Sequence, residues 1–300
     1  MERTKEKLIA VVGATGQQGG GVVRALQARG QFKVRALTRN PDKHPELADE
    51  VVKADLNLPE TLKAAFEGAH GVFLVTNFWE QGTDELKEAT AAVRAANDAG
   101  VKHFVWSTLP DVEAISGGKF DVPHFTGKAK IDRIVKGAGF VNHTFVIAPM
   151  YYHGLVGASV LHKQPDGSTG WALPIDPAVR CLHMGDIAEL GNIVAGAFAH
   201  PDEAGNGEYL PLVGDFMSFH EIISTLNQQG HNFSFKQVPK EVFAAASFPG
   251  AAELADNFGY FQAHTYLGSD SHDRIALANK IAGRLPTKFA AWAQVNVPTT

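Results

Sequence analysis

The stretch Leu8-Ile-Ala-Val-Val-Gly-Ala-Thr-Gly-Gln-Gln-Gly19 decides how the chain folds. It opens with a short apolar run (8–12), continues through three glycines spaced GxxGxxG, and leads into a helical pattern over 18–29. Gly13 permits a tight turn, Gly16 lets the backbone approach a pyrophosphate, and Gly19 lets the helix pack close to the strand. The unpaired amides and the positive dipole end of such a helix favour an anion. The stretch therefore predicts a strand–turn–helix unit that holds dinucleotide phosphates, through Gly13, Ala14, Thr15, Gly16, Gln17, Gln18 and Gly19.

Short apolar runs alternate with helical patterns through the first half of the chain. The apolar runs cover 8–12, 34–38, 50–53, 71–75, 103–107 and 144–147, and the helical patterns cover 18–29, 59–66, 84–99 and 127–137. Runs rich in Val, Ile and Phe, with Gly, Asn, Asp or Pro close by, are typical of buried parallel strands. The alternation predicts the α/β class, with a doubly wound parallel sheet of the Rossmann type. Gly20 and Gly21 extend the glycine run, and we attribute them to packing or to flexibility at the start of the helix.

The pattern changes after about residue 150. We expect a loop or hairpin over 164–177, a helix over 185–199, a strand over 207–212, and a helix over 218–229 that precedes the run 232–238. No internal repeat or low-complexity tract is present. The sequence therefore predicts a Rossmann domain at 1–150 and a smaller mixed α/β lobe at 151–300 that completes the cleft on the substrate side. Part of this second segment is expected to return to the main sheet.

Composition argues against several classes of protein. Hydrophobic residues make up 45% of the 300 positions and charged residues 20%, as in an ordinary globular protein. The net charge of −5, without a run of Lys and Arg, argues against direct binding of nucleic acid. No apolar stretch approaches the roughly 20 residues of a membrane span, and the first residues lack the features of a signal peptide. The single cysteine, Cys181, suits a reducing compartment, so we expect a cytoplasmic protein that does not associate with membranes.

Metal and acyl-transfer chemistry are not expected either. The histidines show no spacing typical of a metal site. Neither Cys181 nor any serine stands in a nucleophile elbow.

The end of the second predicted strand indicates which dinucleotide is preferred. An NAD site usually carries an acid there, which binds the ribose hydroxyls. This strand ends Leu37-Thr38-Arg39-Asn40 instead, and Lys43 adds a second cation. The guanidinium of Arg39 can fork onto a 2′-phosphate and stack on adenine. NADP(H) is therefore favoured over NAD(H), and the alternative for Arg39 is a solvated surface side chain.

Two further loops follow strands at the same edge of the predicted sheet. Asp55 and Leu56 follow the third strand, where the Asp55 carboxylate would accept from the adenine amine or cap the helix that begins near residue 59. Thr76, Asn77 and Phe78 follow the fourth strand, where polar groups would meet ribose or phosphate.

Several quoted stretches together resemble the NmrA-like branch of the atypical short-chain dehydrogenase/reductase family, and most of all its NADP(H) redox sensors. They are Gly13-Ala-Thr-Gly-Gln-Gln-Gly-Gly20, Val34-Arg-Ala-Leu-Thr-Arg-Asn-Pro-Asp-Lys43, Val75-Thr-Asn-Phe-Trp-Glu80, His124-Phe-Thr-Gly-Lys128, Ala148-Pro-Met-Tyr-Tyr152 and Phe248-Pro-Gly-Ala-Ala-Glu-Leu-Ala-Asp-Asn-Phe258. The resemblance implies NADP(H) as cofactor, with Arg39 to Lys43 around the 2′-phosphate. It also implies that Thr76 to Phe78, Lys128 and Tyr151 to Gly154 line the ribose and nicotinamide. The family usually has Asn where this chain has Gly154.

Catalysis is the open question. Reductases of the wider family use Tyr-x-x-x-Lys on a helix, where the Lys lowers the pKa of the Tyr for proton transfer. Lys128 stands in place, but His124 occupies the tyrosine position, and no Tyr occurs before Tyr151. His124 is a candidate proton donor or a histidine without a chemical role. Ser107 and Thr108 are candidates to orient a substrate, and the rings of Tyr151 and Tyr152 are candidates to flank the nicotinamide.

Two functions fit these features. The first is a redox sensor or regulator in which NADP(H) shifts a population of states and changes contacts with a protein partner. The second is an NADPH-dependent reductase of a quinone or carbonyl substrate, with His124 and Lys128 as its catalytic residues. A scaffold with a decayed site is a third, weaker alternative. A homodimer is compatible with each.

Overall fold

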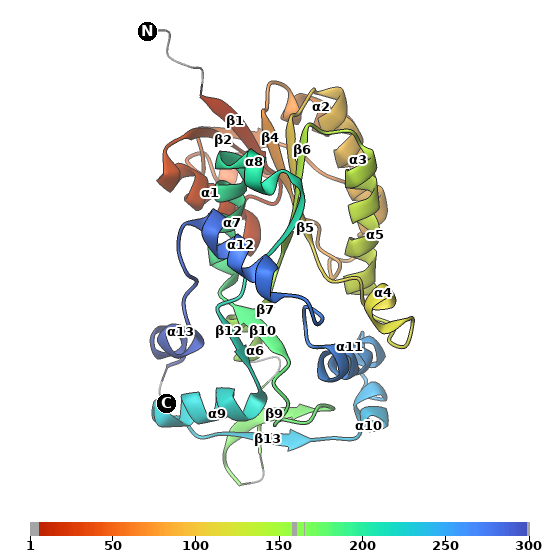
Figure 1. Cartoon of the computed structure of the whole chain (residues 1–300), viewed down its shortest axis with the longest axis vertical. Helices are drawn as coiled ribbons and strands as arrows, with labels where there is room; N and C mark the ends of the chain where they lie inside the picture. The colour runs from red at the N-terminus through yellow and green to blue at the C-terminus, as the bar shows by residue number, and fades with distance from the viewer. Residues whose placement is uncertain (1–5, 158–160, 165, 299–300) are drawn as a thin grey trace.

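A seven-stranded parallel sheet forms the centre of the molecule (Figure 1). The structure is a computed structural model that describes residues 6–157, 161–164 and 166–298. The strands, in the order β11-β6-β5-β4-β1-β2-β3, all pair in parallel. They are β1 (Lys7–Val11), β2 (Phe32–Thr38), β3 (Glu50–Lys53), β4 (Gly71–Leu74), β5 (His103–Thr108), β6 (Asn142–Ile147) and β11 (Asn206–Pro211). The predicted doubly wound sheet is confirmed, and its order reverses at β1, where a crevice forms outside the carboxyl ends of the strands.

Helices cover both faces of this sheet (Figure 1). One face carries α1 (Gln17–Arg29), α7 (Leu190–Ala199) and α12 (His272–Ala282), and the other carries α2 (Glu60–Phe66), α3 (Glu85–Asp98) and α5 (Pro123–Gly137). Side chains of a strand alternate between the faces, so Ile9 and Val11 join the apolar cluster under α1 and α7. Ala10 joins the cluster under α2, α3 and α5. Two separate cores therefore hold the sheet between the helical layers.

Two glycines bring α1 and α7 into close contact. A Cβ on Gly21 would lie 2.5 Å from the carbonyl oxygen of Ala188, and a Cβ on Gly191 would lie 2.1 Å from that of Gly21. Real Cβ atoms do not approach backbone oxygens so closely. Packing therefore explains Gly21, whereas a Cβ on Gly20 would make only ordinary contacts.

The C-terminal part of the chain forms a second body at the carboxyl edge of the sheet (Figure 1). It contains two small sheets, β12-β10-β7 and β13-β9-β8, and a third apolar cluster. Their strands are β7 (Met150–Tyr151), β8 (His162–Lys163), β9 (Thr169–Leu173), β10 (Leu182–Gly185), β12 (Asp215–Met217) and β13 (Phe233–Gln237). The helices are α6 (Tyr152–Leu155), α9 (Phe219–Gln228), α10 (Lys240–Ala244), α11 (Ala251–His264) and α13 (Phe289–Asn296), with α8 (Pro201–Ala204) near the main sheet. The short helix α4 (Val112–Ser116), from the first half of the chain, packs against α11.

The chain after residue 150 contributes to both bodies. β11 pairs with β6 in the main sheet, as expected, and α7 and α12 pack against that sheet. The division at residue 150 stays a prediction. β9 lies within the segment 164–177 that was expected to be a loop or hairpin, and it pairs antiparallel with β8, which lies just before that segment. Residue 165 lies outside the described residues.

Two predicted helices have different bounds. The helix expected over 127–137 begins at Pro123, because proline is favoured in the first turn, and this places His124 on the helix. The helix expected over 185–199 was wrong in its first third, over 185–189. There β10 ends at Gly185, and the Asp186 side chain caps the short helix η2 (Ile187–Glu189) before α7 begins at Leu190.

No described helix has both the length and the apolar composition needed to cross a bilayer. The described part of the chain also contains no group of three or more His, Cys, Asp or Glu side chains arranged to hold a metal ion.

Candidate functional site

A cleft of about 940 Å³ lies at the carboxyl edge of the main sheet. The loops that follow β1 to β6 line one side of it, since parallel strands all end at this edge. Residues of the second body close the other side, and they include Leu254, Asn257, Phe261 and Tyr266. The cleft is therefore bounded by both parts of the chain.

The glycine-rich turn forms the floor of this cleft where α1 begins. Gly13 has a φ of 69°, which favours glycine, and its carbonyl accepts from the Gly16 amide at 2.9 Å. A Cβ on Gly19 would lie 2.2 Å from the carbonyl oxygen of Gly13, so the helix can approach the turn only with glycine there. Gly16 is the N-cap and places no side chain over the first amides of α1. These amides have no acceptor within the helix, so an anion can bind them.

Most predicted residues of the turn line the cleft, but Ala14 does not. Gly13, Thr15, Gly16, Gln17, Gln18 and Gly19 line it. Ala14 is fully buried, and its amide donates to the carbonyl of Leu37 at 3.4 Å. Ala14 therefore joins the turn to β2.

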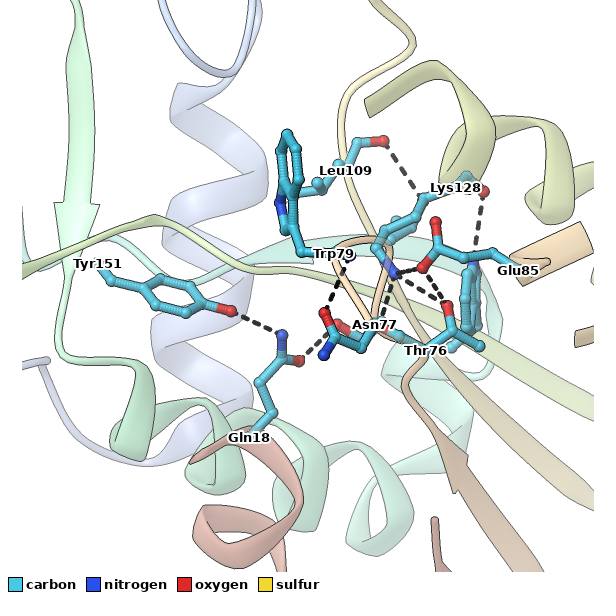
Figure 2. Close-up of polar contacts among 11 residues, drawn as sticks. Gln18, Thr76, Asn77, Trp79, Glu85, Leu109, Lys128 and Tyr151 are labelled. Atoms are coloured by element: carbon cyan, nitrogen blue, oxygen red, sulfur yellow. Dashed lines mark hydrogen bonds and ion pairs between the residues drawn. The ribbon is translucent and has the colours of Figure 1, made fainter. Parts of the chain in front are cut away.

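Gln18 connects three elements across the cleft. Its Nε2 donates to the Tyr151 hydroxyl at 2.8 Å, and its Oε1 accepts from Oγ of Ser107 at 2.6 Å. Figure 2 shows this side chain between the start of α1 and Tyr151. Burial raises the pKa of the Tyr151 phenol, and the hydrogen bond from Gln18 only partly opposes that effect. The phenol is therefore a hydrogen-bonding group near neutral pH and not a phenolate.

Tyr152 corrects the prediction that both tyrosines flank a nicotinamide. Its side chain is fully buried and packs against Phe289 and Trp292, with ring centroids at 5.2 and 5.3 Å. Its hydroxyl donates to the carbonyl of Thr287 at 3.0 Å. Tyr151 ends β7 and Tyr152 begins α6, so the two adjacent side chains point to different places. Only Tyr151 lines the cleft.

Lys128 lies in a buried ion pair at the wall of the cleft (Figure 2). Its Nζ donates to Oε1 of Glu85 at 2.6 Å, and to both the carbonyl and the hydroxyl oxygen of Thr76 at 3.0 Å. These contacts use all three donors of the ammonium group. Burial lowers the pKa of Lys128, and the Glu85 carboxylate opposes that shift. The ammonium is thus held by the loop after β4 and by the first turn of α3.

His124 forms a second side-chain pair, with Glu253 of α11. Oε1 of Glu253 accepts from the His124 backbone amide at 2.9 Å and pairs with Nδ1 of its ring at 2.5 Å. Burial raises the pKa of Glu253, but the hydrogen bonds from His124 prevail and lower it below its usual value. Trp79 and Phe78 lie against the imidazole, with centroids at 5.3 and 5.9 Å. Among the described residues Nε2 has no hydrogen-bond partner, so it is available to a molecule in the cleft.

The end of the cleft near β2 carries the remaining predicted residues. Arg39 and Asn40 line it, and Nη1 of Arg39 lies 2.5 Å from Oε1 of Glu80. Lys43 ends the exposed turn η1 (Pro41–Lys43) and is not among the lining residues, whereas His44 is.

Asp55 and Leu56 also line this end. Oδ1 of Asp55 accepts from the Asn57 amide at 3.0 Å, and α2 has Pro59 at its N-cap with no side-chain cap. The alternative that Asp55 caps α2 is therefore wrong.

The profile of the NmrA-like family matches residues 5–291. This chain belongs to the NmrA-like family. An NmrA-like family domain-containing protein of Dictyostelium discoideum is 32% identical over 244 residues, covering 76% of this chain and 80% of its own length. The NmrA-like family domain-containing oxidoreductase FrzB of Cladobotryum sp. is 33% identical over 247 residues, covering 74% of this chain and 73% of its own.

Solved structures of similar proteins share the fold of this NmrA-like chain. NmrA, a negative transcriptional regulator crystallised in complex with NADP, has a TM-score of 0.81 at 23% identity, with 98% of this chain and 96% of that chain covered. NmrA was also crystallised in complex with NAD. The NADPH-dependent quinone oxidoreductase QOR2 of Escherichia coli, complexed with NADPH, has a TM-score of 0.76 at 21% identity, with 96% and 99% covered.

Three acidic residues that the sequence did not single out pair with residues that line the NmrA-like cleft. Glu80, Glu85 and Glu253 each pair with a predicted site residue. Glu85 follows the N-cap Asp84, where an acid is expected for helix stability alone. Glu253 comes from a helix 129 residues further along the chain than His124, and no spacing rule connects them.

Proposed function

We propose that this NmrA-like protein binds NADP(H) in the cleft and acts as a redox sensor. The observation that carries the proposal is the continuity of the cleft from Arg39, past the open N-terminus of α1, to Lys128 and Tyr151. The residues present fit the cofactor, since Gly16 leaves the first amides of α1 uncovered and the guanidinium of Arg39 is 60% exposed. The NADP complex of the structurally similar NmrA supports the same assignment.

The assigned contacts follow the length of the cleft. Gly13, Thr15, Gly16, Gln17, Gln18 and Gly19 hold the pyrophosphate, and Arg39 with Asn40 binds the 2′-phosphate. Lys43 lies beside them as a more distant cation. Asp55 and Leu56 contact the adenine. Thr76, Asn77, Phe78, Lys128 and Tyr151 surround the nicotinamide ribose.

A sensing role is favoured because the residues at the usual catalytic positions, 124 and 128, are not arranged for proton transfer by a tyrosine. No phenol stands at position 124, and the donors of Lys128 are already committed to Thr76 and Glu85. A ligand in this cleft touches both bodies of the molecule, so it can favour one arrangement of them over another. The output is a changed contact with a protein partner or a second copy of this chain, in the cytoplasm, where a lone buried Cys181 is stable as a thiol.

A second candidate, an NADPH-dependent reductase of a quinone or carbonyl compound, is favoured by the His124–Glu253 pair. When bound, NADPH would supply the hydride that reduces the substrate carbon. Nε2 of a protonated His124 then gives its proton to the substrate oxygen, and the Glu253 carboxylate holds Nδ1 and stabilises the imidazolium. In this second function the Glu85 carboxylate holds the Lys128 side chain in position and favours its charged form.

One pair of measurements separates the two functions. NADP(H) binding is titrated, and NADPH oxidation is followed with a panel of quinones and carbonyl compounds. Binding without turnover supports the sensor, and turnover supports the reductase if Gly16→Val abolishes it. A valine there fills the space above the α1 amides, whereas the backbone contact it makes, 3.3 Å from Cβ to the Gly13 carbonyl, leaves the fold possible. If the wild type binds no nucleotide, both functions are wrong.

A further inference from the structure

The counter-charge on Arg39 belongs to a loop that the sequence assigned to ribose or phosphate. Glu80 lies between β4 and α3, 41 residues from Arg39, and its Oε1 lies 2.5 Å from Nη1. Both side chains line the cleft, at 60% and 42% exposure. A carboxylate oxygen therefore occupies an anion position on the guanidinium, where a phosphoryl oxygen would bind.

Short turns hold Glu80 in this place. The Glu80 amide donates to the carbonyl of Asn77 at 3.2 Å, and the Glu80 carbonyl accepts from the Thr83 amide at 3.2 Å. Oδ1 of Asn77 also accepts from the Trp79 amide at 3.2 Å, as Figure 2 shows. The loop therefore presents Glu80 to Arg39 from a defined conformation.

Further negative charge surrounds this pair. Asp55 and Glu88 also line the cleft, and the negative charge of each raises the pKa of Arg39. Burial and the neighbouring charges of Glu85 and Glu80 raise the pKa of Glu88. A phosphate dianion that enters here meets one guanidinium and several carboxylates, and Glu80 is the carboxylate in direct contact.

We propose that Glu80 determines how strongly the cleft prefers NADP(H) over NAD(H). This inference rests on the proposed nucleotide site. A nucleotide without a 2′-phosphate can bind while the pair stays intact, and the Glu80 carboxylate can accept from its ribose hydroxyls. A nucleotide with a 2′-phosphate must displace Glu80 from Arg39 and then bind near a like charge. Glu80 therefore weakens the preference that Arg39 alone would give.

The test is the ratio of dissociation constants, Kd for NAD divided by Kd for NADP, in wild type and Glu80→Gln. The glutamine keeps the size of the side chain and removes its charge. Two unit charges at this distance and exposure change binding by about three- to tenfold after solvent screening. Glu80→Gln should therefore lower the Kd for NADP about three- to tenfold, leave the Kd for NAD equal or higher, and lose this effect as salt is raised.

Glu67→Gln is the matched control. Glu67 is exposed where α2 ends, and α2 begins at the carboxyl edge of the sheet and therefore ends at the opposite edge. Glu67→Gln changes the net charge as Glu80→Gln does, but at a position that does not face the cleft. The dissociation constants for NAD and NADP should therefore stay at their wild-type values. Thermal unfolding of both variants verifies that they fold.

The outcomes separate this inference from the proposed function. An unchanged or smaller ratio in Glu80→Gln, with a wild type that binds both nucleotides, overturns the role of Glu80 and leaves the nucleotide site in place. A wild type that binds neither NADP nor NAD, nor the fragment 2′,5′-ADP, overturns the proposed function and the role of Glu80 together. An increased ratio in Glu80→Gln but not in Glu67→Gln supports both.

Discussion

Nζ of Lys128 lies 2.6 Å from Oε1 of Glu85, with side chains that are only 10% and 7% exposed. The hydroxyl of Thr76 donates to the same carboxylate oxygen at 2.5 Å, while Oε2 has no hydrogen-bond partner among the described residues. A charge pair buried to this degree is sensitive to the loss of either partner, because the remaining charge stays desolvated.

Removal of the Lys128 charge should therefore destabilise the fold. We expect Lys128→Met to lower the free energy of unfolding by about 3–5 kcal/mol, because it leaves the Glu85 carboxylate buried without a counter-ion. The double variant Lys128→Met/Glu85→Gln should lose less than the sum of the single losses. Denaturant unfolding measures all three variants.

Lys130→Met is the control for this cycle. Lys130 pairs with Glu113 at 2.9 Å, but the two side chains are 53% and 60% exposed, so its loss should lower the free energy of unfolding far less than the loss of Lys128 does. Equal losses in Lys128→Met and Lys130→Met would contradict the assignment of a buried, coupled pair.

Glu253→Gln should change the chemical state of His124 with little change in the fold. The glutamine still accepts from the His124 amide, but it no longer favours the tautomer protonated on Nδ1. ¹⁵N NMR of the imidazole should show a mixture of tautomers in the variant and mainly the Nδ1–H form in the wild type near pH 8. If the protein is a reductase, NADPH oxidation should also fall by about 10²-fold.

Rescue by the conservative variant distinguishes positioning from a structural role. Glu253→Asp should restore part of the Nδ1–H population. An unchanged tautomer ratio in Glu253→Gln would show that Glu253 only caps the first turn of α5.

Asp132 should make stability depend on pH. Burial raises the pKa of this carboxyl to about 6, although hydrogen bonds, among them one from the Tyr209 hydroxyl at 2.8 Å, oppose the shift. Between about pH 4 and pH 6 the unfolded chain releases this proton while the folded chain retains it, so rising pH favours unfolding through this group. The full effect, at most about 3 kcal/mol, is present above pH 6 and absent below pH 4.

Asp132→Asn removes this titration and tests its sign. Relative to wild type, the free energy of unfolding of the variant should rise as the pH increases from 4 to 7. Asp98→Asn, at an exposed position on α3, is the control, for which the difference from wild type should stay nearly constant. A difference that falls with pH for Asp132→Asn would contradict the burial of an ionisable carboxyl there.

The first six strands of the main sheet could be predicted from the sequence because each depends on local pattern. The glycine spacing before α1 and the short apolar runs suffice, since consecutive strand–helix units have one favoured handedness. β3, for example, has the bounds expected from its apolar run. β10 could not be predicted as a separate strand, because it is only four residues long and its last residue, Gly185, stands where the helix expected over 185–199 begins.

In the candidate site, too, some residues could be predicted from local sequence and others could not. The turn at Gly13 to Gly19 and the cation at Arg39 follow from local sequence, whereas Glu80, which pairs with Arg39, lies 41 residues away along the chain. Tyr151 and Tyr152 are neighbours in the sequence, but the Tyr151 side chain lines the cleft and the Tyr152 side chain lies in the core. A position next to a site residue therefore does not predict that a side chain reaches the site. Contacts such as Glu253 with His124 depend on how the second body packs on the first, which no local pattern encodes.

The central claim is that a diphosphate binds at the start of α1 while Arg39 recognises an additional phosphate on the adenosine. It is tested most directly by titrating NADP, NADPH, NAD and NADH against wild type and Arg39→Ala at one salt concentration. We predict that the wild type binds the two phosphorylated nucleotides more tightly, and that Arg39→Ala binds all four with similar affinity. A wild type that prefers NAD(H), or an Arg39→Ala variant that keeps the preference for NADP(H), would contradict it.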